Sequence, residues 1–261
     1  MDDGKVLVSM CEHAQLLSLD VKSETGSTKV DALDLARDAL PIPVAVLAEF
    51  QSSGRGRRGR VWHAPFASGL ALSFACEFPG GASRLEGLSL AVGVCLAELL
   101  RRRGVQNVAL KWPNDIYWKN KKLAGILLEM RGELSGPSAV VIGVGLNISM
   151  PSSSIDVKKI DQPWIDLETI LGKKVNRNEF TAFVIDALFD VLNEIPDKQN
   201  TLLEEWQQTD VLKDQNVEVV FADKTICGTA IGINREGAIR LLHEVKEIVC
   251  HAVEVTISGG Y

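Results

Sequence analysis

The chain has 261 residues, and 28 Lys and Arg against 34 Asp and Glu give it a formal net charge of −6 at pH 7. This acidic balance argues against a protein whose whole surface is built to hold polyanions, and 46% hydrophobic with 24% charged residues excludes a disordered chain. Five cysteines, widely spaced and without a CxxC pair, argue against both a disulfide framework and a zinc cage.

No apolar stretch is long enough to cross a bilayer. The longest runs over 139–146 and includes two glycines, well short of the ~20 residues that a membrane span needs. The N-terminus carries Asp2, Asp3 and Lys5 and lacks the apolar core of a signal peptide. We therefore expect a soluble cytoplasmic protein that has no membrane partner.

The first part of the chain mixes strands, hairpins and helices. Strands are predicted at 17–23, 43–50, 70–78, 108–112, around Tyr117, at 123–130 and at 139–148. One helix is predicted to begin at Ser27 or Thr28, with apolar positions Leu33, Ala36 and Leu40, and a second covers 84–103. This mixture predicts an α+β fold, with a mixed, largely antiparallel sheet and helices packed on one of its faces.

The second part changes its pattern twice. Residues 149–163 are polar and rich in Ser and Pro, which predicts a mobile loop. Apolar residues at helical spacing predict an amphipathic helix from Phe180 to Ile195. After Trp206 a period of two predicts four or five short strands that close into a small, SH3-like β-barrel. We expect two domains, 1–210 and 211–261.

The most informative segment is 51–62 (QSSGRGRRGRVW), which holds three glycines, four arginines and no acid. It formally satisfies G-x-G-x-x-G, but the dinucleotide motif needs a helix that opens at the third glycine. The residues that follow, RVWHAP, are poor helix formers. Two interpretations stay open: a solvated or non-specific nucleic-acid patch, or a loop whose guanidiniums hold phosphate oxygens. Its position between two predicted strands favours a site loop, and Trp62 could stack on a base.

A second group of polar residues lies in 111–115 (KWPND) and at Lys122. The Pro-Asn pair predicts a turn that presents Asn114 and Asp115. Across the predicted hairpin Lys111 and Lys122 could approach each other, and two ammonium groups would offset the negative charge of a reacting carboxylate and phosphate. The alternative is a polar turn with surface lysines.

A third segment, 143–147 (GVGLN), ends a buried strand. Its glycines would allow a ligand to approach the backbone closely, with Asn147 bonding to a base or phosphate. Packing of these glycines against a helix is an equally good interpretation. His63 is a lone histidine in a basic loop and is more often incidental than catalytic.

Taken together, these segments resemble the biotin protein ligases, also called biotin–[acetyl-CoA-carboxylase] ligases. Four motifs carry the resemblance in the family's order: 54–60 with Trp62, 111–115, 122–125 and 143–147. The resemblance implies a two-step activity. Biotin and MgATP give biotinyl-5′-adenylate and pyrophosphate, and the acyl group then passes to one lysine of the biotin carboxyl carrier protein of acetyl-CoA carboxylase.

The resemblance also implies site residues. Those expected at biotin are Ser27, Thr28, Lys29, Gln51, Gly54, Arg55, Gly56, Arg57, Lys122, Gly125 and Gly143. Those expected at ATP or the adenylate are Arg57, Arg60, Trp62, Asn114, Lys122 and Asn147. Catalytic roles are implied for Lys122, Arg57, Lys111 and Asp115, with Asp115 orienting or deprotonating the acceptor lysine. No metal site within the protein is implied, because Mg²⁺ enters with ATP.

Two departures from the family pattern stand out. The family usually reads Ser-Thr-Asn at the biotin end, whereas this chain has Lys29 in the third position, and its tail lacks an arginine that some members place near the nucleotide. Bifunctional members carry an N-terminal DNA-binding domain, and only about 20 residues precede the first predicted strand here. We therefore expect a ligase that does not bind operator DNA. A homodimer through a sheet edge is compatible with the resemblance.

Two other functions fit parts of this pattern. A lipoate–protein ligase uses the same adenylation chemistry, but such ligases do not typically carry the Gly/Arg run together with KWPND. A nucleic-acid-binding module would use the arginine loop, and the net charge of −6 with a single basic loop argues against it.

Overall fold

The computed structural model describes residues 13, 16–36, 43–78, 85–132, 138–154, 156–221, 224–251 and 254–258. The strands are β1 (Ser18–Thr25), β2 (Val44–Gln51), β3 (Gly69–Phe78), β4 (Val108–Lys111), β5 (Asp115–Trp118), β6 (Lys121–Gly132), β7 (Ser138–Asn147), β8 (Asn216–Val220), β9 (Thr225–Ile233), β10 (Ile239–His243), β11 (Lys246–Cys250) and β12 (Glu254–Ile257). The helices are α2 (Thr28–Leu35), α3 (Leu85–Arg102), α4 (Leu167–Leu171) and α5 (Arg177–Gln208), with 3₁₀ turns η3 (Arg57–Gly59) and η5 (Val157–Lys159).

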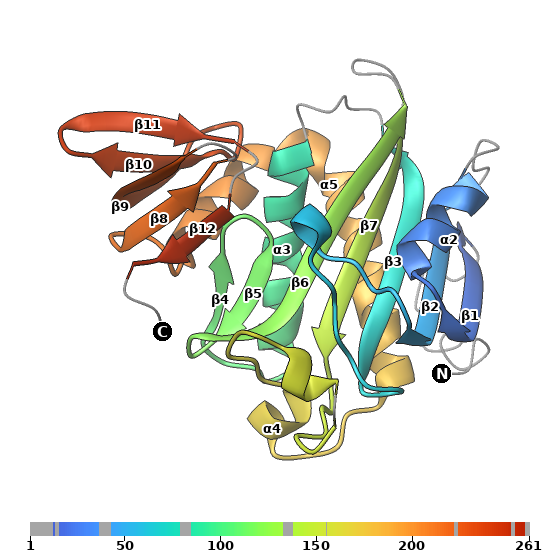
Figure 1. Cartoon of the computed structure of the whole chain (residues 1–261). Coiled ribbons are helices and arrows are strands. Elements are labelled where there is room, and N and C mark those ends of the chain that lie inside the picture. Colours follow the sequence, from blue (N-terminus) through green and yellow to red (C-terminus); the bar gives the residue numbers. More distant parts are fainter. Residues whose placement is uncertain are drawn as a thin grey trace.

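The larger sheet has seven strands in the order β1-β2-β3-β7-β6-β5-β4. β1 and β2 are parallel, and every other neighbouring pair is antiparallel. Figure 1 shows α3 and α5 lying side by side behind this sheet. The predicted α+β fold with a mixed, largely antiparallel sheet is therefore confirmed.

The two faces of this sheet carry side chains of different size, because alternate residues of a strand point to opposite faces. One face is bulky and packs against α3 and α5, with Leu72, Phe74 and Ile142 fully buried in the main core. On the opposite face the central strands carry small residues in matching rows. Ala71 pairs with Gly145, Gly145 pairs in turn with Gly125, and Ser73 pairs with Gly143. The small side chains leave room for a ligand above the sheet.

The helix α2 corrects the prediction that all helices share one face. It packs on the small-residue face, where Ala32 and Leu33 bury against Val46, Ala75 and Val141 in a separate cluster. The physical reason is that α2 connects two parallel strands, so the handedness of this crossover decides its face. The helix ends at Leu35, and Leu40 of the predicted helix lies outside the described residues.

The helix α5 is longer than the sequence predicts. Asn176 caps it by accepting hydrogen bonds from the backbone N–H groups of Asn178 and Glu179, and it runs through Pro196 to Gln208. A proline usually ends or kinks a helix, but burial of Trp206 at 2% exposure anchors the last turns of this one. The segment 149–163 is a loop as predicted and contains η5, while its mobility stays a prediction.

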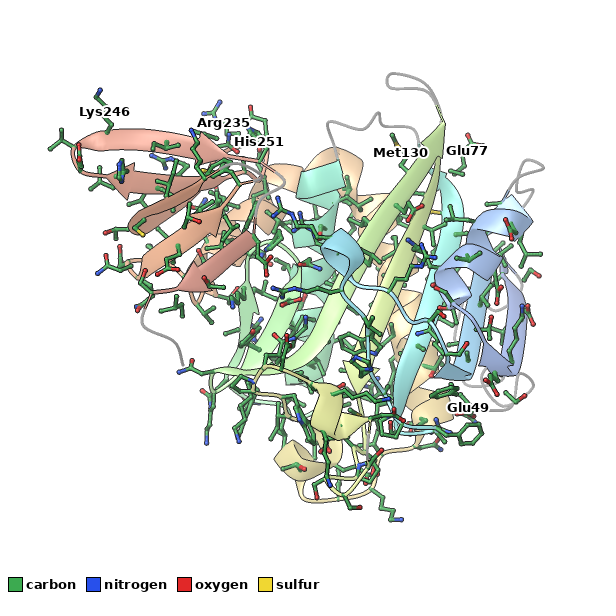
Figure 2. All side chains as sticks on the ribbon, in the orientation of Figure 1. Glu49, Glu77, Met130, Arg235, Lys246 and His251 are labelled. Carbon is green, nitrogen blue, oxygen red and sulfur yellow. The ribbon has the colours of Figure 1, made fainter. Side chains whose placement is uncertain are left out.

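The second sheet has five antiparallel strands in the order β11-β10-β9-β8-β12. Within the described residues no pairing joins β11 to β12, so closure into an SH3-like barrel stays a prediction. The sheet packs against the rest of the molecule: Val217 and Leu241 belong to the main core, and the Trp112 indole N–H donates to the Gly237 carbonyl at 2.9 Å. Lys246 points away from the larger sheet (Figure 2).

In the part of the chain that the structure describes, no helix combines the length and the apolar character needed to cross a membrane. Cys76, Cys95, Cys227 and Cys250 are free thiols, and Cys11 lies outside the described residues. Burial raises the pKa of Cys76 to about 12, so this thiol is unreactive at neutral pH.

A buried carboxyl at the junction of the two sheets predicts a pH dependence of stability. Burial raises the pKa of Asp210 to about 7, and no described group donates to its Oδ2. Its ionisation in the folded state is therefore costly, so its destabilising effect is absent below about pH 4 and grows as the pH rises through 7. Asp210→Asn should flatten the pH dependence of the unfolding free energy between pH 5 and 8 by on the order of 2 kcal/mol, measured by denaturant titration. An unchanged slope would contradict the assignment.

Candidate functional site

A cavity of about 850 Å³ lies over the small-residue face of the larger sheet. This volume is within the range of pockets that hold small molecules. It is lined by the first turn of α2, the central strands, the loop 55–63, the segment 159–164 and residues 254–257 of the C-terminal sheet. Sixteen of the seventeen predicted site residues line it, Gly54 being the exception.

The floor of the cavity is made of glycines that hold one aromatic ring. A Cβ atom on Gly145 would lie 2.6 Å from Trp62 Cε2, and one on Gly125 would lie 3.3 Å from Trp62 Cζ3. Any side chain at Gly145 would therefore displace the indole. The structure supports close approach as the reason for these glycines, as the sequence suggested for 143–147, although the ring that approaches belongs to the chain itself.

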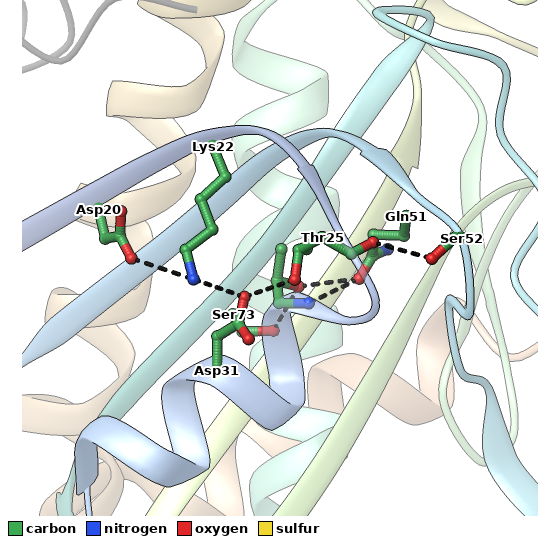
Figure 3. Close-up of polar contacts among 8 residues, drawn as sticks. Asp20, Lys22, Thr25, Asp31, Gln51, Ser52 and Ser73 are labelled. Carbon is green, nitrogen blue, oxygen red and sulfur yellow. Dashed lines mark hydrogen bonds and ion pairs between the residues drawn. The ribbon is translucent and has the colours of Figure 1, made fainter.

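One end of the cavity is a polar cluster built by α2, β2 and β3. The Thr28 backbone N–H and hydroxyl both donate to Gln51 Oε1, at 2.9 and 3.1 Å, and the Thr28 hydroxyl lies 2.8 Å from the Ser73 hydroxyl (Figure 3). Ser27 is the N-cap residue of α2, yet its side chain makes no capping hydrogen bond. Hydroxyl and amide groups of this kind can bind a neutral polar ligand.

A second network braces the same turn from behind. Thr25 Oγ1 and Lys22 Nζ donate to Asp31 Oδ2 at 2.7 and 2.8 Å (Figure 3). Burial alone would raise the pKa of Asp31, but the hydrogen bonds from Lys22 and Thr25 outweigh it and lower that pKa below its ordinary value. The charged carboxylate therefore fixes α2 against β1.

Lys29, where the family usually has Asn, points across the sheet. Its Nζ forms an ion pair with Glu129 of β6, and its side chain is only 14% exposed. Lys29 also lines the cavity. The structure therefore places a charge pair beside the polar cluster rather than a free ammonium group.

At the other end of the cavity lies a second charge pair. Lys122 Nζ is 2.8 Å from Asp115 Oδ1, with 15% and 17% of the two side chains exposed, and 5.7 Å from the centre of the Trp62 ring. Lys111 is opposite Asp115 in the β4–β5 register and lies 3.5 Å from the Tyr117 hydroxyl. The hairpin thus places Lys111 opposite Asp115, whose carboxylate pairs with Lys122. A close approach of the two lysines stays a prediction.

The two predicted asparagines support the backbone of this end. Asn114 donates its side-chain N–H to the Ile126 carbonyl, and the Ile126 N–H donates back to the Asn114 carbonyl at 2.8 Å. Asn147 donates to the Ile165 carbonyl at 3.1 Å. The Asn147 amide nitrogen also donates to the Lys122 carbonyl at 3.4 Å, so its amide oxygen is the atom that this side chain can offer to a ligand.

The Gly/Arg loop forms a lid over the cavity and passes in front of β6 and β7 (Figure 1). It folds back on itself, since the Gly56 N–H donates to the Arg60 carbonyl at 2.8 Å and the Trp62 N–H to the Gly54 carbonyl at 2.9 Å. A Cβ atom on Gly54 would lie 2.7 Å from the Trp62 carbonyl oxygen. Its only helical element is the short turn η3, which agrees with rejecting the dinucleotide-binding interpretation.

The arginines of the lid contact two other parts of the molecule. Arg57 lies over the Trp112 ring, 6.0 Å from its centre. Arg58 donates to the Val220 carbonyl at 3.3 Å, and Arg60 forms an ion pair with Glu254. The lid is therefore held closed by the C-terminal sheet.

Three residues of the site are not predicted from the sequence: Trp164, Ser73 and Glu254. Trp164 lines the cavity beside Lys122, because the Lys122 N–H donates to the Pro163 carbonyl and the Ile165 N–H to the Lys122 carbonyl. A lone tryptophan after the polar run 149–163 was the available signal. Ser73, a single hydroxyl in an apolar strand, was another signal, whereas nothing in the sequence pairs Glu254 with Arg60. Among the described residues no group of three or more His, Cys, Asp or Glu is arranged to hold a metal ion.

Comparisons with known proteins identify the class of protein. The Biotin/lipoate A/B protein ligase family matches residues 22–147. The bifunctional ligase/repressor BirA of Salmonella typhimurium is 39% identical over 92% of this chain and 73% of its own length. BirA of Escherichia coli is 37% identical over 76% of this chain, and the match spans 61% of that protein. The chain therefore belongs to this family of ligases.

A solved structure agrees with this assignment. The biotin protein ligase from Aquifex aeolicus in complex with biotin and ATP superposes with a TM-score of 0.77, covering 92% of this chain and 99% of that one at 24% identity. At this identity the superposition shows a shared fold. This likeness covers 92% of the chain, well beyond the residues 22–147 that the family matches.

The contact between the lid and the C-terminal sheet gives a prediction. Glu254→Gln removes the carboxylate that holds Arg60, so trypsin should cleave after the lid arginines up to about fivefold faster, the effect of a partly exposed ion pair. Glu247→Gln, which breaks an ion pair with Arg240 in the same sheet, is the control and should leave lid cleavage unchanged. Equal cleavage rates in the two variants would show that Glu254 does not hold the lid.

Proposed function

We propose that this chain is an ATP-dependent biotin protein ligase. It forms biotinyl-5′-adenylate from biotin and MgATP and then transfers the biotinyl group to a lysine of the biotin carboxyl carrier protein of acetyl-CoA carboxylase. One observation carries the proposal: a single cavity has a neutral polar cluster at one end and Lys122 under an arginine-rich lid at the other. Such a cavity can hold a ligand with a neutral bicyclic head group at one end and a reactive carboxylate at the other.

The polar cluster is the proposed site of the ureido ring of biotin. Thr28, Gln51 and Ser73 offer hydroxyl and amide groups that match its N–H and C=O groups. The acyl chain then runs over the floor past Gly143 toward Gly125, beside the Trp62 ring that lies on Gly125 and Gly145. This direction brings the carboxylate to Lys122.

In the first step a carboxylate oxygen of biotin attacks the α-phosphorus of ATP. The new O–P bond forms as the bond to the β-phosphate oxygen breaks, and pyrophosphate leaves. Both reactants are anions, so cations and positioning supply the catalysis. Lys122 lies where the two meet, and Arg57 and Arg60 close over the phosphates from the lid. The indoles of Trp62 and Trp164 offer flat faces for adenine.

In the second step the acceptor lysine attacks the acyl carbon and AMP leaves. The amine must lose a proton, and Asp115 is the proposed acceptor. In the free protein Asp115 is paired with Lys122. When Lys122 turns to the phosphate, the carboxylate of Asp115 becomes available to the incoming amine. The closed lid excludes water, which would otherwise hydrolyse the adenylate.

The proposal extends to the domains. We assign residues 1–210 to the catalytic domain and residues 211–261 to an SH3-like barrel whose contacts with Arg58 and Arg60 hold the lid. The direct test of the whole proposal is mass spectrometry of a purified carrier domain after incubation with this protein, biotin and MgATP. One added biotinyl group that requires both substrates is expected. An unmodified carrier would contradict the proposal.

Lys122 should be essential to the first step. Lys122→Ala is expected to lower biotin-dependent exchange of pyrophosphate into ATP by about 100-fold, the usual effect of losing one donor at a developing charge. ATP binding, followed by calorimetry, should change much less. Lys121→Ala, at the exposed neighbouring position, is the matched control. Exchange at the unsubstituted rate in Lys122→Ala would dismiss this role.

Arg57 should retain the intermediate. Arg57→Gly is expected to form the adenylate but to release it, so that lysines of a bystander protein such as serum albumin become biotinylated several-fold more. The reason is that a guanidinium closing over the phosphoester slows its escape. Arg235→Gly, at an exposed arginine in the turn between β9 and β10 (Figure 2), is the control. Bystander labelling at the unsubstituted level, measured by mass spectrometry, would rule out retention by Arg57.

A further inference from the structure

The register of the larger sheet shows what lies behind the polar cluster. Gly125, Leu127 and Glu129 follow one another along the cavity face of β6, and their partners on β7 are Gly145, Gly143 and Val141. Each of these residues forms a row across the sheet with its β7 partner, and the rows of Gly125 and Leu127 line the cavity. In the row of Glu129, Val141 is fully buried beneath α2. The floor of the cavity therefore ends at this row.

The ion pair between Lys29 and Glu129 spans this last row. Lys29 comes from the first turn of α2, which packs over β2, β3 and β7, and Glu129 comes from β6, the next strand of the sheet. The adjacent Thr28 belongs to the polar cluster. In Figure 2 the next residue of β6, Met130, lies near the end of the sheet with Glu77. The pair thus stands between the polar cluster and that end.

Charge and burial explain why the two residues are held together. The Lys29 side chain is 14% exposed and that of Glu129 is 39% exposed, so the ammonium group is largely removed from water. A buried charge without a partner is costly, and loss of one partner destabilises more than loss of both. Neither side chain can therefore turn into the cavity without leaving the other unpaired.

The length of the cavity fits the proposed substrate. From Gly125, near the end of the Lys122 side chain, to Glu129 are four residues of strand, roughly 13 Å at ~3.3 Å per residue. That length suits a bicyclic ring with a valeric acid chain and leaves little beyond the ring.

We infer that the Lys29–Glu129 ion pair is the end wall of the biotin subsite and determines specificity by limiting the size of the head group. The inference rests on the proposed function. It gives Lys29 a role other than direct contact with biotin: the ammonium group binds Glu129, and the closed pair excludes head groups larger than the unsubstituted ureido ring.

The test compares biotin with N-methyl biotin, which has one more methyl group on a ureido nitrogen. The readout is the ratio of kcat/KM for the two acids in pyrophosphate–ATP exchange. The unsubstituted protein should prefer biotin by at least about 100-fold, because one extra carbon in a tight pocket costs about that much and methylation also removes an N–H donor. The lost N–H is common to all variants, so a change in the preference between variants reports the wall. The double variant Lys29→Ala with Glu129→Ala removes the wall without leaving a lone charge, and its preference should fall at least tenfold. Its KM for ATP should stay unchanged.

Two further variants distinguish a local effect of the ion pair on the size of the pocket from a general effect of losing an ion pair. The charge swap Lys29→Glu with Glu129→Lys rebuilds the pair and should keep the preference within about threefold of the unsubstituted value. Arg240→Gln with Glu247→Gln removes an ion pair of the C-terminal sheet and should leave the preference intact. Both kcat/KM values of a variant are measured on the same preparation. A smaller folded fraction therefore lowers both values equally and leaves their ratio unchanged. For a variant with weak turnover, calorimetry gives the ratio of the dissociation constants of the two acids instead.

The outcomes are distinct. If the unsubstituted protein uses biotin but the double alanine variant keeps its full preference, the inference is wrong and the proposed function stands. An unsubstituted protein that accepts N-methyl biotin as well as biotin also overturns the inference alone. If the unsubstituted protein shows no biotin-dependent exchange, the proposed function and the inference are both overturned.

Discussion

Along β3, β7 and β6, large and small residues alternate, and the strict alternation of a strand sends them to opposite faces of the sheet. Leu72, Phe74 and Ile142 bury one face beneath α3 and α5, which supplies the core. The same alternation leaves Ser73, Gly143 and Gly145 on the other face, where the cavity forms. Stability and the binding site are therefore two faces of the same strands, and a change of register by one residue would destroy both.

A second constraint is electrostatic. The chain carries a net charge of −6, yet the cavity collects Lys111, Lys122 and the arginines of the lid. Reaction between a carboxylate and a polyphosphate brings negative charges together, and fixed cations in a closed site stabilise them more than water does. The glycine floor adds no charge of its own. Two acid side chains that line the cavity are paired with cations, Asp115 with Lys122 and Glu254 with Arg60. Glu129, at the end of its floor, is paired with Lys29.

The sequence predicted local features better than those that depend on the assembled fold. The Gly/Arg loop, the KWPND turn and the GVGLN strand end were identified because each is compact and its residue types limit the local chemistry. The predicted face for α2 was wrong, because the handedness of the β1–β2 crossover decides on which face of the sheet this helix packs. The contact between Arg60 and Glu254 joins residues almost two hundred positions apart, and no local pattern encodes it. Lys29 stood out as a departure, but only the register of β6 reveals its partner.

The central claim is that one cavity holds the biotinyl adenylate between the polar cluster and Lys122. A crystal structure of this protein with biotinyl-5′-AMP tests it most directly. The account predicts the ureido ring at Thr28 and Gln51, the acyl phosphate at Lys122 and the lid ordered over it. An adenylate bound elsewhere, or bound here with the lid making no contact, would contradict the account.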